Sequence, residues 1–116
     1  FVPGSPLEPR EVIRVIRQAS GIPVLAHPIY MEQDALIDQF VADGLMGLEV
    51  YHSGHTPEQI RHYAGIADRL KLLKTGGSDY HGRSKEGLPV GAVKVPYALV
   101  EALKECHRRQ TNASCA

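Results

Sequence analysis

The sequence predicts an α/β fold built from parallel βα units. Three short apolar runs, at 22–26, 46–51 and 71–75, each follow a segment whose apolar residues have helical spacing. The first run, 22–26, is apolar on both alternating sets of positions, which is typical of a strand buried on both faces of a parallel sheet. Because helices and strands alternate, we expect parallel strands joined by crossover helices. Ligands in such folds bind at the carboxyl ends of the strands.

Three helices are predicted to precede these strands. The first begins near Pro9, since proline is tolerated in the first helical turn, and it ends at Gly21. The second spans 32–42, with Gly44 as its C-cap. The third has the strongest start signal, because Thr56-Pro57-Glu58-Gln59 combines an N-cap threonine, a first-turn proline and a capping-box glutamine.

The C-terminal part is less regular. We expect a polar loop over 82–87 and a short edge strand over 88–95, interrupted by a proline and a glycine. A last helix is predicted to open at Pro96 and to fray into a polar tail over 108–116. The whole chain, 1–116, is predicted to be one domain. A domain of this length can bury a hydrophobic core without the help of disulfides.

The composition excludes several classes of protein. Hydrophobic residues make up 43% of the chain and charged residues 22%, which is ordinary for a globular domain. The 13 basic and 13 acidic side chains balance, so no global attraction for nucleic acid or an anionic membrane is expected. The two cysteines do not indicate a disulfide framework, and no apolar run approaches the ~18 residues of a membrane span. We expect a cytoplasmic protein that does not bind membranes.

Polar residues with metal-binding chemistry follow each predicted strand. His27 follows the first, His52 and His55 follow the second, and Asp79 and His81 follow the third between glycines. In an extended segment, side chains two residues apart project to the same side, so Asp79 and His81 can converge on one ion. The alternatives are an ordinary surface turn for this pair and a buried, hydrogen-bonded histidine at position 27.

Four further residues belong to the predicted surroundings of this site. Glu49 lies in a strand that otherwise looks buried, and a buried carboxylate needs a partner. It either orients a metal ligand from behind or pairs with a lysine. Ser78 is assigned to the same supporting layer. Arg83 and Lys85 in the following loop either recruit phosphate or are ordinary exposed charges.

Three segments together resemble the PHP (polymerase and histidinol phosphatase) family of metal-dependent phosphoesterases. They are Val24-Leu25-Ala26-His27-Pro28, then 47–51 leading to His55-Thr56-Pro57-Glu58, and Gly76-Gly77-Ser78-Asp79-Tyr80-His81-Gly82. The resemblance covers nearly the whole chain and is greatest to the stand-alone, TrpH- or YciV-like branch that acts on small nucleotides. It depends on the order and spacing of the motifs, since any one of them would be weak.

The resemblance implies a distorted seven-stranded (β/α) barrel with a cluster of divalent metals at its C-terminal mouth. It also implies that His27, Asp79 and His81 are metal ligands, and mixed nitrogen and carboxylate ligands suit Mn, Fe or Zn. His55 is implied to contact phosphate or substrate, and we place His52 and Arg83 on the same substrate side. Many members have glycine and often arginine after Ala-His-Pro, where this chain has Ile29 and Tyr30. The resemblance therefore does not extend to a phosphate contact from that loop.

The family's first ligands, a His-x-His pair and further acids and histidines, lie upstream of the segments present here. The chain therefore resembles the C-terminal portion of such a protein, and its missing N-terminal barrel half is an expected partner. The implied function of the intact protein is metal-dependent hydrolysis of nucleotide or oligonucleotide-end phosphoesters, with this chain inactive alone. The alternatives are a non-catalytic binding or structural module and a sugar or histidinol phosphate monoesterase. Exposed strand edges also make a homo-oligomer possible.

Overall fold

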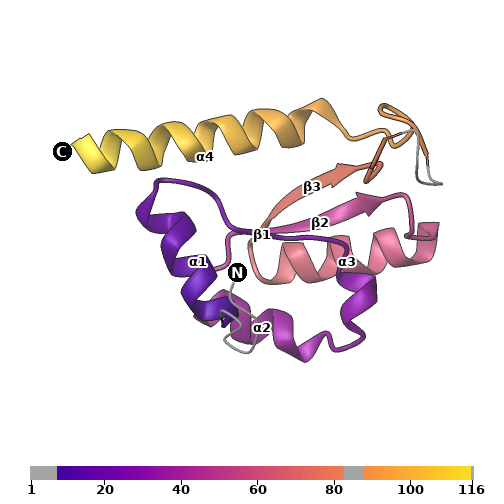
Figure 1. Ribbon diagram of the computed structural model, residues 1–116, viewed down its shortest axis with the longest axis horizontal. Coiled ribbons are helices and arrows are strands. Elements are labelled where there is room, and N and C mark those ends of the chain that lie inside the picture. The colour runs from indigo at the N-terminus through magenta and orange to yellow at the C-terminus, as the bar shows by residue number, and fades with distance from the viewer. Residues whose placement is uncertain (1–7, 83–87, 116) are drawn as a thin grey trace.

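A computed structural model describes residues 8–82 and 88–115, with side chains to residue 112. The chain forms helices and strands in alternation (Figure 1). In chain order they are α1 (Pro9–Gln18), β1 (Val24–Leu25), the 3-10 helix η1 (Pro28–Met31), α2 (Ala35–Ala42), β2 (Gly47–His52), α3 (Pro57–Arg69), β3 (Leu73–Gly77) and α4 (Tyr97–Cys115).

The three strands form one parallel sheet in the order β1-β2-β3. In the register, Gly47 lies opposite both Val24 of β1 and Leu73 of β3. A bulge interrupts the pairing of β2 with β3 between Glu49 and Tyr51. The arrowheads of β2 and β3 point toward the same edge of the sheet (Figure 1). The predicted parallel α/β fold is confirmed, whereas closure into a seven-stranded barrel stays a prediction.

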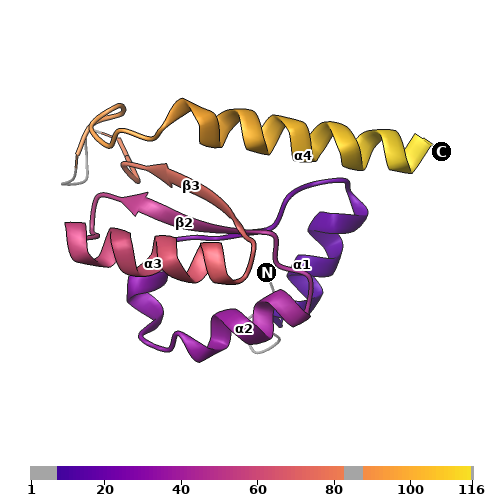
Figure 2. The same ribbon diagram turned by 180° about the vertical axis from the view of Figure 1, so that it is seen from behind.

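Helices lie on two sides of the strands. Both views show α4 beside β3, while α2 and α3 lie on the other side of the sheet (Figures 1 and 2). The core forms between α1, α2, α3 and the strands, and its buried members are Ile13, Ile37, Leu45, Leu48, Val50, Tyr63, Ala67 and Leu72. Full burial of one such side chain contributes about 1.5–3 kcal/mol, so this cluster is the main source of cohesion.

The start of α3 agrees in detail with the sequence. The backbone N–H of Gln59 donates to Thr56 Oγ1 at 3.2 Å, and the N–H of Thr56 donates to Gln59 Oε1 at 2.8 Å. These two bonds satisfy amide donors that would otherwise have no partner in the first helical turn. The predicted capping box is confirmed, and it sets the residue at which α3 begins after β2.

The predicted helix over 32–42 is wrong in its first part. A separate 3-10 turn, η1, comes first, and α2 begins only at Ala35. Glu32 has a φ of 55°, in the left-handed region, and so it ends η1 instead of starting a helix. The result is a short excursion after β1 that carries Tyr30 to the same end of the sheet as His27.

The predicted edge strand over 88–95 is also wrong. The described part of that segment is a turn and irregular backbone, with Gly91 at a φ of 85° and the Ala92 N–H donating to the Pro89 carbonyl at 3.1 Å. Proline removes a ladder donor and left-handed glycine bends the chain, so pairing is not continued. After this segment, α4 continues to Cys115 and so includes most of the tail over 108–116 that is predicted to fray. Fraying of these residues stays a prediction.

Among the residues that the structure describes, none of the helices is both long enough and apolar enough to cross a membrane.

Candidate functional site

The predicted site residues gather at the carboxyl edge of the sheet. His27 follows β1, His52 is the last residue of β2, and Asp79 lies two residues after the end of β3. The His27 and His52 rings approach to 5.4 Å between centroids. His52 Nε2 lies 3.3 Å from Asp79 Oδ2. Because parallel strands end at one edge, three separate chain segments meet here.

Asp79 and His81 lie close to each other, but a turn brings them together and not the extended backbone that the sequence predicts. Asp79 has a φ of 58°, so the segment is not extended at this point. His81 folds back in this left-handed turn, and its Nδ1 donates to the Asp79 carbonyl at 2.6 Å. The same nitrogen lies 3.7 Å from Asp79 Oδ1. The pair therefore converges through a tight turn that only a few residue types, aspartate among them, tolerate.

The surroundings of Asp79 favour its charged form. The hydrogen bond from His52 is the main cause that lowers the pKa of the Asp79 carboxyl, and electrostatic interactions with His81, His52 and His27 act in the same direction. Burial opposes the shift without cancelling it. A carboxylate that is ionised at neutral pH is the form that binds a cation.

These residues do not form a closed ligand set by themselves. Within 8–82 and 88–112, no three His, Cys, Asp or Glu side chains are grouped closely enough to hold a metal ion. The nitrogen and carboxylate donors at the edge nevertheless match the ligand types of Mn, Fe and Zn. The metal-ligand roles of His27, Asp79 and His81 therefore stay predictions, and any complete site needs additional ligands.

Glu49 supports the backbone of His27. Its Oε1 accepts a hydrogen bond from the His27 N–H at 2.8 Å. His27 has a φ of 27°, a sparsely populated conformation that surrounding structure must hold in place. Of the two predicted alternatives, the contact seen among the described residues is with the segment that carries a candidate ligand, and none of the described lysines pairs with Glu49. Glu49 thus connects β2 to the loop after β1.

Replacing Glu49 with alanine is expected to destabilise the protein by about 1–3 kcal/mol, since a part-buried donor at His27 loses its partner. Glu49→Gln keeps a carbonyl oxygen that can accept the same hydrogen bond, so it should remain close to wild type. Urea unfolding of both variants measures the difference. Equal stability of the two variants would show that the hydrogen bond has no such role.

His52 and His55 are buried, with 3% and 7% of their surface exposed. His55 Nδ1 donates to the Val50 carbonyl at 2.7 Å, and its ring stacks on Tyr63 at 5.0 Å between centroids. Both side chains therefore expose little surface, and their predicted contact with a substrate stays a prediction. The buried Nε2 of His55 has no hydrogen-bond partner among the described residues.

The pKa of the Tyr63 hydroxyl is raised in the folded protein. Burial, and secondly the Asp34 carboxylate, raise its pKa above the ordinary value of 10.0. The unfolded chain therefore loses this proton at a lower pH than the folded chain does. The resulting stability is present below about pH 10 and is lost as the pH rises through the folded-state pKa.

The substitution Tyr63→Phe should make the decrease of the unfolding free energy with rising pH less steep, because it removes this titrating hydroxyl. Urea unfolding between pH 9 and 11 measures the decrease in both proteins. An unchanged slope would contradict this.

Ser78 acts through its main chain in this structure. Its carbonyl accepts a hydrogen bond from Ser53 Oγ at 3.1 Å, which ties the segment after β3 to the segment after β2. A supporting role for its side chain stays a prediction. Arg83, the remaining predicted substrate contact, lies outside the described residues.

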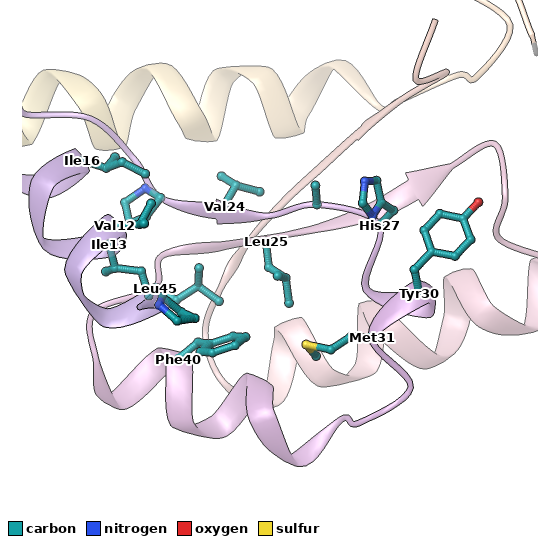
Figure 3. A pocket seen from close by; sticks show the side chains of 13 residues that line it. Val12, Ile13, Ile16, Val24, Leu25, His27, Tyr30, Met31, Phe40 and Leu45 are labelled. Atoms are coloured by element: carbon teal, nitrogen blue, oxygen red, sulfur yellow. The ribbon is translucent and has the colours of Figure 1, made fainter. Parts of the chain in front are cut away.

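Sequence reasoning missed Tyr30 as a neighbour of the site. Its ring centroid lies 5.1 Å from that of His27 and 6.0 Å from that of His52, and 65% of the residue is exposed. Figure 3 shows His27 and Tyr30 at one end of an apolar pocket of about 460 Å³. The pocket lies between α1, β1, η1 and α2, and Ile13, Phe40 and Leu45 line its other end. The only sequence signal was the position of Tyr30 just after Ala-His-Pro.

Two curated relatives are similar to part of the chain. The chain is 39% identical over 77 residues to a phosphoribosyl 1,2-cyclic phosphate 1,2-diphosphodiesterase from Eggerthella lenta, covering 66% of the chain and 29% of that protein. It is 35% identical over 78 residues to a 3',5'-nucleoside bisphosphate phosphatase from Chromobacterium violaceum, covering 63% and 27%. No protein-family model matches the chain.

Two solved structures share the fold. A Bifidobacterium adolescentis protein provisionally assigned as a metal-dependent phosphoesterase superposes with a TM-score of 0.75 and 35% identity, over 91% of this chain and 39% of that one. An amidohydrolase from Chromobacterium violaceum, with bound sulfate and no metal, gives a TM-score of 0.68 and 26% identity, over 90% and 42%.

These matches confirm the resemblance to phosphoesterases that the motifs predict. The chain spans less than a third of the length of the two curated relatives.

Proposed function

We propose that this chain is the C-terminal part of a PHP-family metal-dependent phosphoesterase that hydrolyses nucleotide-like phosphates. The observation that carries the proposal is that His27, Asp79 and His81 all lie at the carboxyl edge of one parallel sheet, in a chain that is similar to phosphoesterases. Catalytic groups in folds of this kind lie at that edge. The lowered pKa of Asp79 supports a role in binding a cation.

His27, Asp79 and His81 would hold one of the metal ions, and Mn, Fe and Zn are the candidates because the donors are imidazole and carboxylate. A metal bound there supplies charge neutralisation at the phosphoryl group and acidifies a water molecule. Asp79 contributes a negative charge at the mouth of the sheet. Glu49 keeps the backbone of His27 in its unusual conformation, and so fixes the position from which that ring projects.

The rest of the barrel is proposed to lie against β1. Within the part of the chain that the structure describes, β1 pairs only with β2, and the apolar pocket beside His27 opens on that side. The relatives are more than three times as long as the matched region, which leaves ample chain for further strands. We infer that those strands pair with β1, cover the pocket and supply the remaining ligands. The chain alone is therefore expected to have little or no hydrolase activity.

The substrate class is proposed to be a phosphorylated ribose that carries a base or a second phosphate. The names of the two curated relatives share a ribose phosphate, in a phosphoribosyl cyclic phosphate and in a nucleoside bisphosphate. Tyr30, whose ring lies near those of His27 and His52, is 65% exposed, and Tyr80, which follows Asp79 in the chain, is 44% exposed. An exposed aromatic ring offers a surface on which a nucleobase can stack. This favours a nucleotide over a simple sugar or histidinol phosphate.

A non-catalytic module is the second candidate, and the specific observation in its favour is the absence of a three-residue ligand group among the described residues. The two candidates differ in whether the full-length protein turns over substrate with metal. We would assay the full-length protein with Mn²⁺ against nucleoside bisphosphates, ribose cyclic phosphates and histidinol phosphate. Hydrolysis of the first two classes, abolished by EDTA, is expected.

The 116-residue chain serves as the matched comparison in the same assay. Strong metal-dependent turnover by that chain alone would contradict the proposal that further ligands are needed. No hydrolysis by the full-length protein with any of Mn²⁺, Fe²⁺ or Zn²⁺ would favour the binding module. Hydrolysis of histidinol phosphate alone would overturn the proposed substrate class.

A further inference from the structure

Both ring nitrogens of His52 have a defined partner. The backbone N–H of Gly54 donates to His52 Nδ1 at 2.9 Å. Because that nitrogen accepts a hydrogen bond, it carries no proton, and the proton of a neutral ring lies on Nε2. Nε2 faces Asp79 Oδ2 at 3.3 Å. The hydrogen-bonding pattern therefore makes His52 a donor to the carboxylate of Asp79.

The ring of His52 is also fixed in place by its neighbours. It is 3% exposed and lies between the rings of His27, Tyr30 and His55, at centroid distances of 5.4, 6.0 and 5.5 Å. Gly54 allows the close approach on the Nδ1 side, because a Cβ at that position would lie 3.1 Å from Nδ1 and 2.9 Å from the Tyr30 hydroxyl. The donor direction of Nε2 is thus set before any ligand binds.

Asp79 needs such a restraint more than a buried ligand would. Its side chain is 41% exposed, its own backbone is in the left-handed region, and it lies outside the regular pairing of β3. A carboxylate in this setting can rotate freely unless a neighbour holds one of its oxygens. His52 holds Oδ2, and this leaves Oδ1 toward His81.

We propose that His52 is a positioning residue that orients the Asp79 carboxylate for metal binding through its Nε2–H donor, and that it does not contact substrate. The inference deepens the proposed function and rests on it, since it takes Asp79 as a ligand. Partners behind metal ligands typically change metal affinity by about 10–100-fold when removed. The role replaces the substrate contact that the sequence predicts for His52.

Two substitutions in the full-length protein separate the donor from the rest of the ring. His52→Asn keeps an oxygen near Nδ1 that can accept from Gly54, but it has no donor at the position of Nε2. His52→Gln places an amide N–H2 near that position and restores the donor. We expect His52→Asn to weaken Mn²⁺ binding by about tenfold or more in titration calorimetry, and His52→Gln to stay near wild type. Equal losses in the two variants would overturn the proposal.

A second measurement does not depend on metal or on any substitution. Long-range proton–nitrogen NMR correlations of the imidazole rings report which nitrogen carries the proton. We expect His52 of the metal-free protein to carry it on Nε2. A proton on Nδ1 alone would overturn the proposal, because Asp79 would then have no donor to hold it.

The Asp79→Ala variant distinguishes failure of this inference from failure of the proposed function. If Asp79→Ala abolishes Mn²⁺ binding while His52→Asn binds like wild type, only the positioning role is wrong. If Asp79→Ala also binds Mn²⁺ like wild type, Asp79 is no ligand and both proposals fall. Circular dichroism of each variant shows that the fold is retained.

Discussion

Replacing Asp79 with alanine is expected to lower the Mn²⁺ affinity of the full-length protein by about 100-fold or more. The pKa of Asp79 is lowered, its side chain is partly exposed and it contacts His52, so it is a carboxylate well suited to bind a cation if the proposal is right. Loss of an outer partner alone costs about 10–100-fold in affinity, and loss of a direct ligand should exceed that. Titration calorimetry with Mn²⁺ and with Zn²⁺ measures the change.

The chain offers a matched control for nonspecific metal binding. His62 is exposed on α3 and pairs with Asp34 at 2.6 Å, so it is a histidine–carboxylate pair outside the candidate site. His62→Ala should leave the Mn²⁺ affinity unchanged, whereas His27→Ala should reduce it as Asp79→Ala does. The metal-site assignment would be wrong if His62→Ala and Asp79→Ala had the same effect.

Elements with complete local signals were predicted well. The start of α3 was correct because the capping residues and the first-turn proline lie within four consecutive positions, and their hydrogen bonds are all local. The strands were located because each contains a short apolar stretch after a predicted helix, although the observed bounds of all three differ from the predicted ones by one or two residues. Such boundary shifts are expected, since tertiary pairing decides where a ladder begins.

Elements that depend on a single backbone angle were missed. The left-handed conformation of Glu32 separates η1 from α2. Glutamate rarely adopts this conformation, so its presence in the sequence does not predict one. The segment after Gly87 contains apolar residues in a strand-like order, but Pro89 and Gly91 prevent pairing. In both places the pattern of apolar residues predicted a regular helix or strand, but a left-handed residue or a proline interrupts the regular backbone there.

The location of the site was predictable, but its internal contacts were not. Placement of His27, His52 and Asp79 at one edge follows from parallel topology alone. The hydrogen bond between His52 and Asp79 joins residues 27 apart in sequence, and it depends on the exact register of β2 with β3. Likewise, no pattern in the sequence indicates that Glu49 accepts from the backbone of His27. These contacts give His52 and Glu49 their partners in the structure, while the roles predicted for both residues stay predictions.

The register of β2 with β3 makes Gly76 the described glycine with the least space for a Cβ atom. It lies opposite Tyr51, immediately after the bulge in β2. A Cβ on Gly76 would lie 2.5 Å from Tyr51 Cβ, 2.6 Å from the Tyr51 carbonyl oxygen and 2.8 Å from Val95 Cγ2. The first two atoms are fixed to the backbone of β2, so they can move only if the strands separate.

Gly76→Ala is therefore expected to destabilise the protein by about 1–3 kcal/mol, and to weaken Mn²⁺ binding because β3 carries Asp79. Gly77→Ala is the control at the next position, where a Cβ would meet no atom within 4 Å. It should be neutral or slightly stabilising, since alanine restricts the unfolded chain more than glycine does. Urea unfolding of the two variants measures the contrast. If they unfold at the same denaturant concentration, the close pairing of Gly76 with Tyr51 does not exist in solution, and the approach of His52 to Asp79 that depends on this register loses its basis.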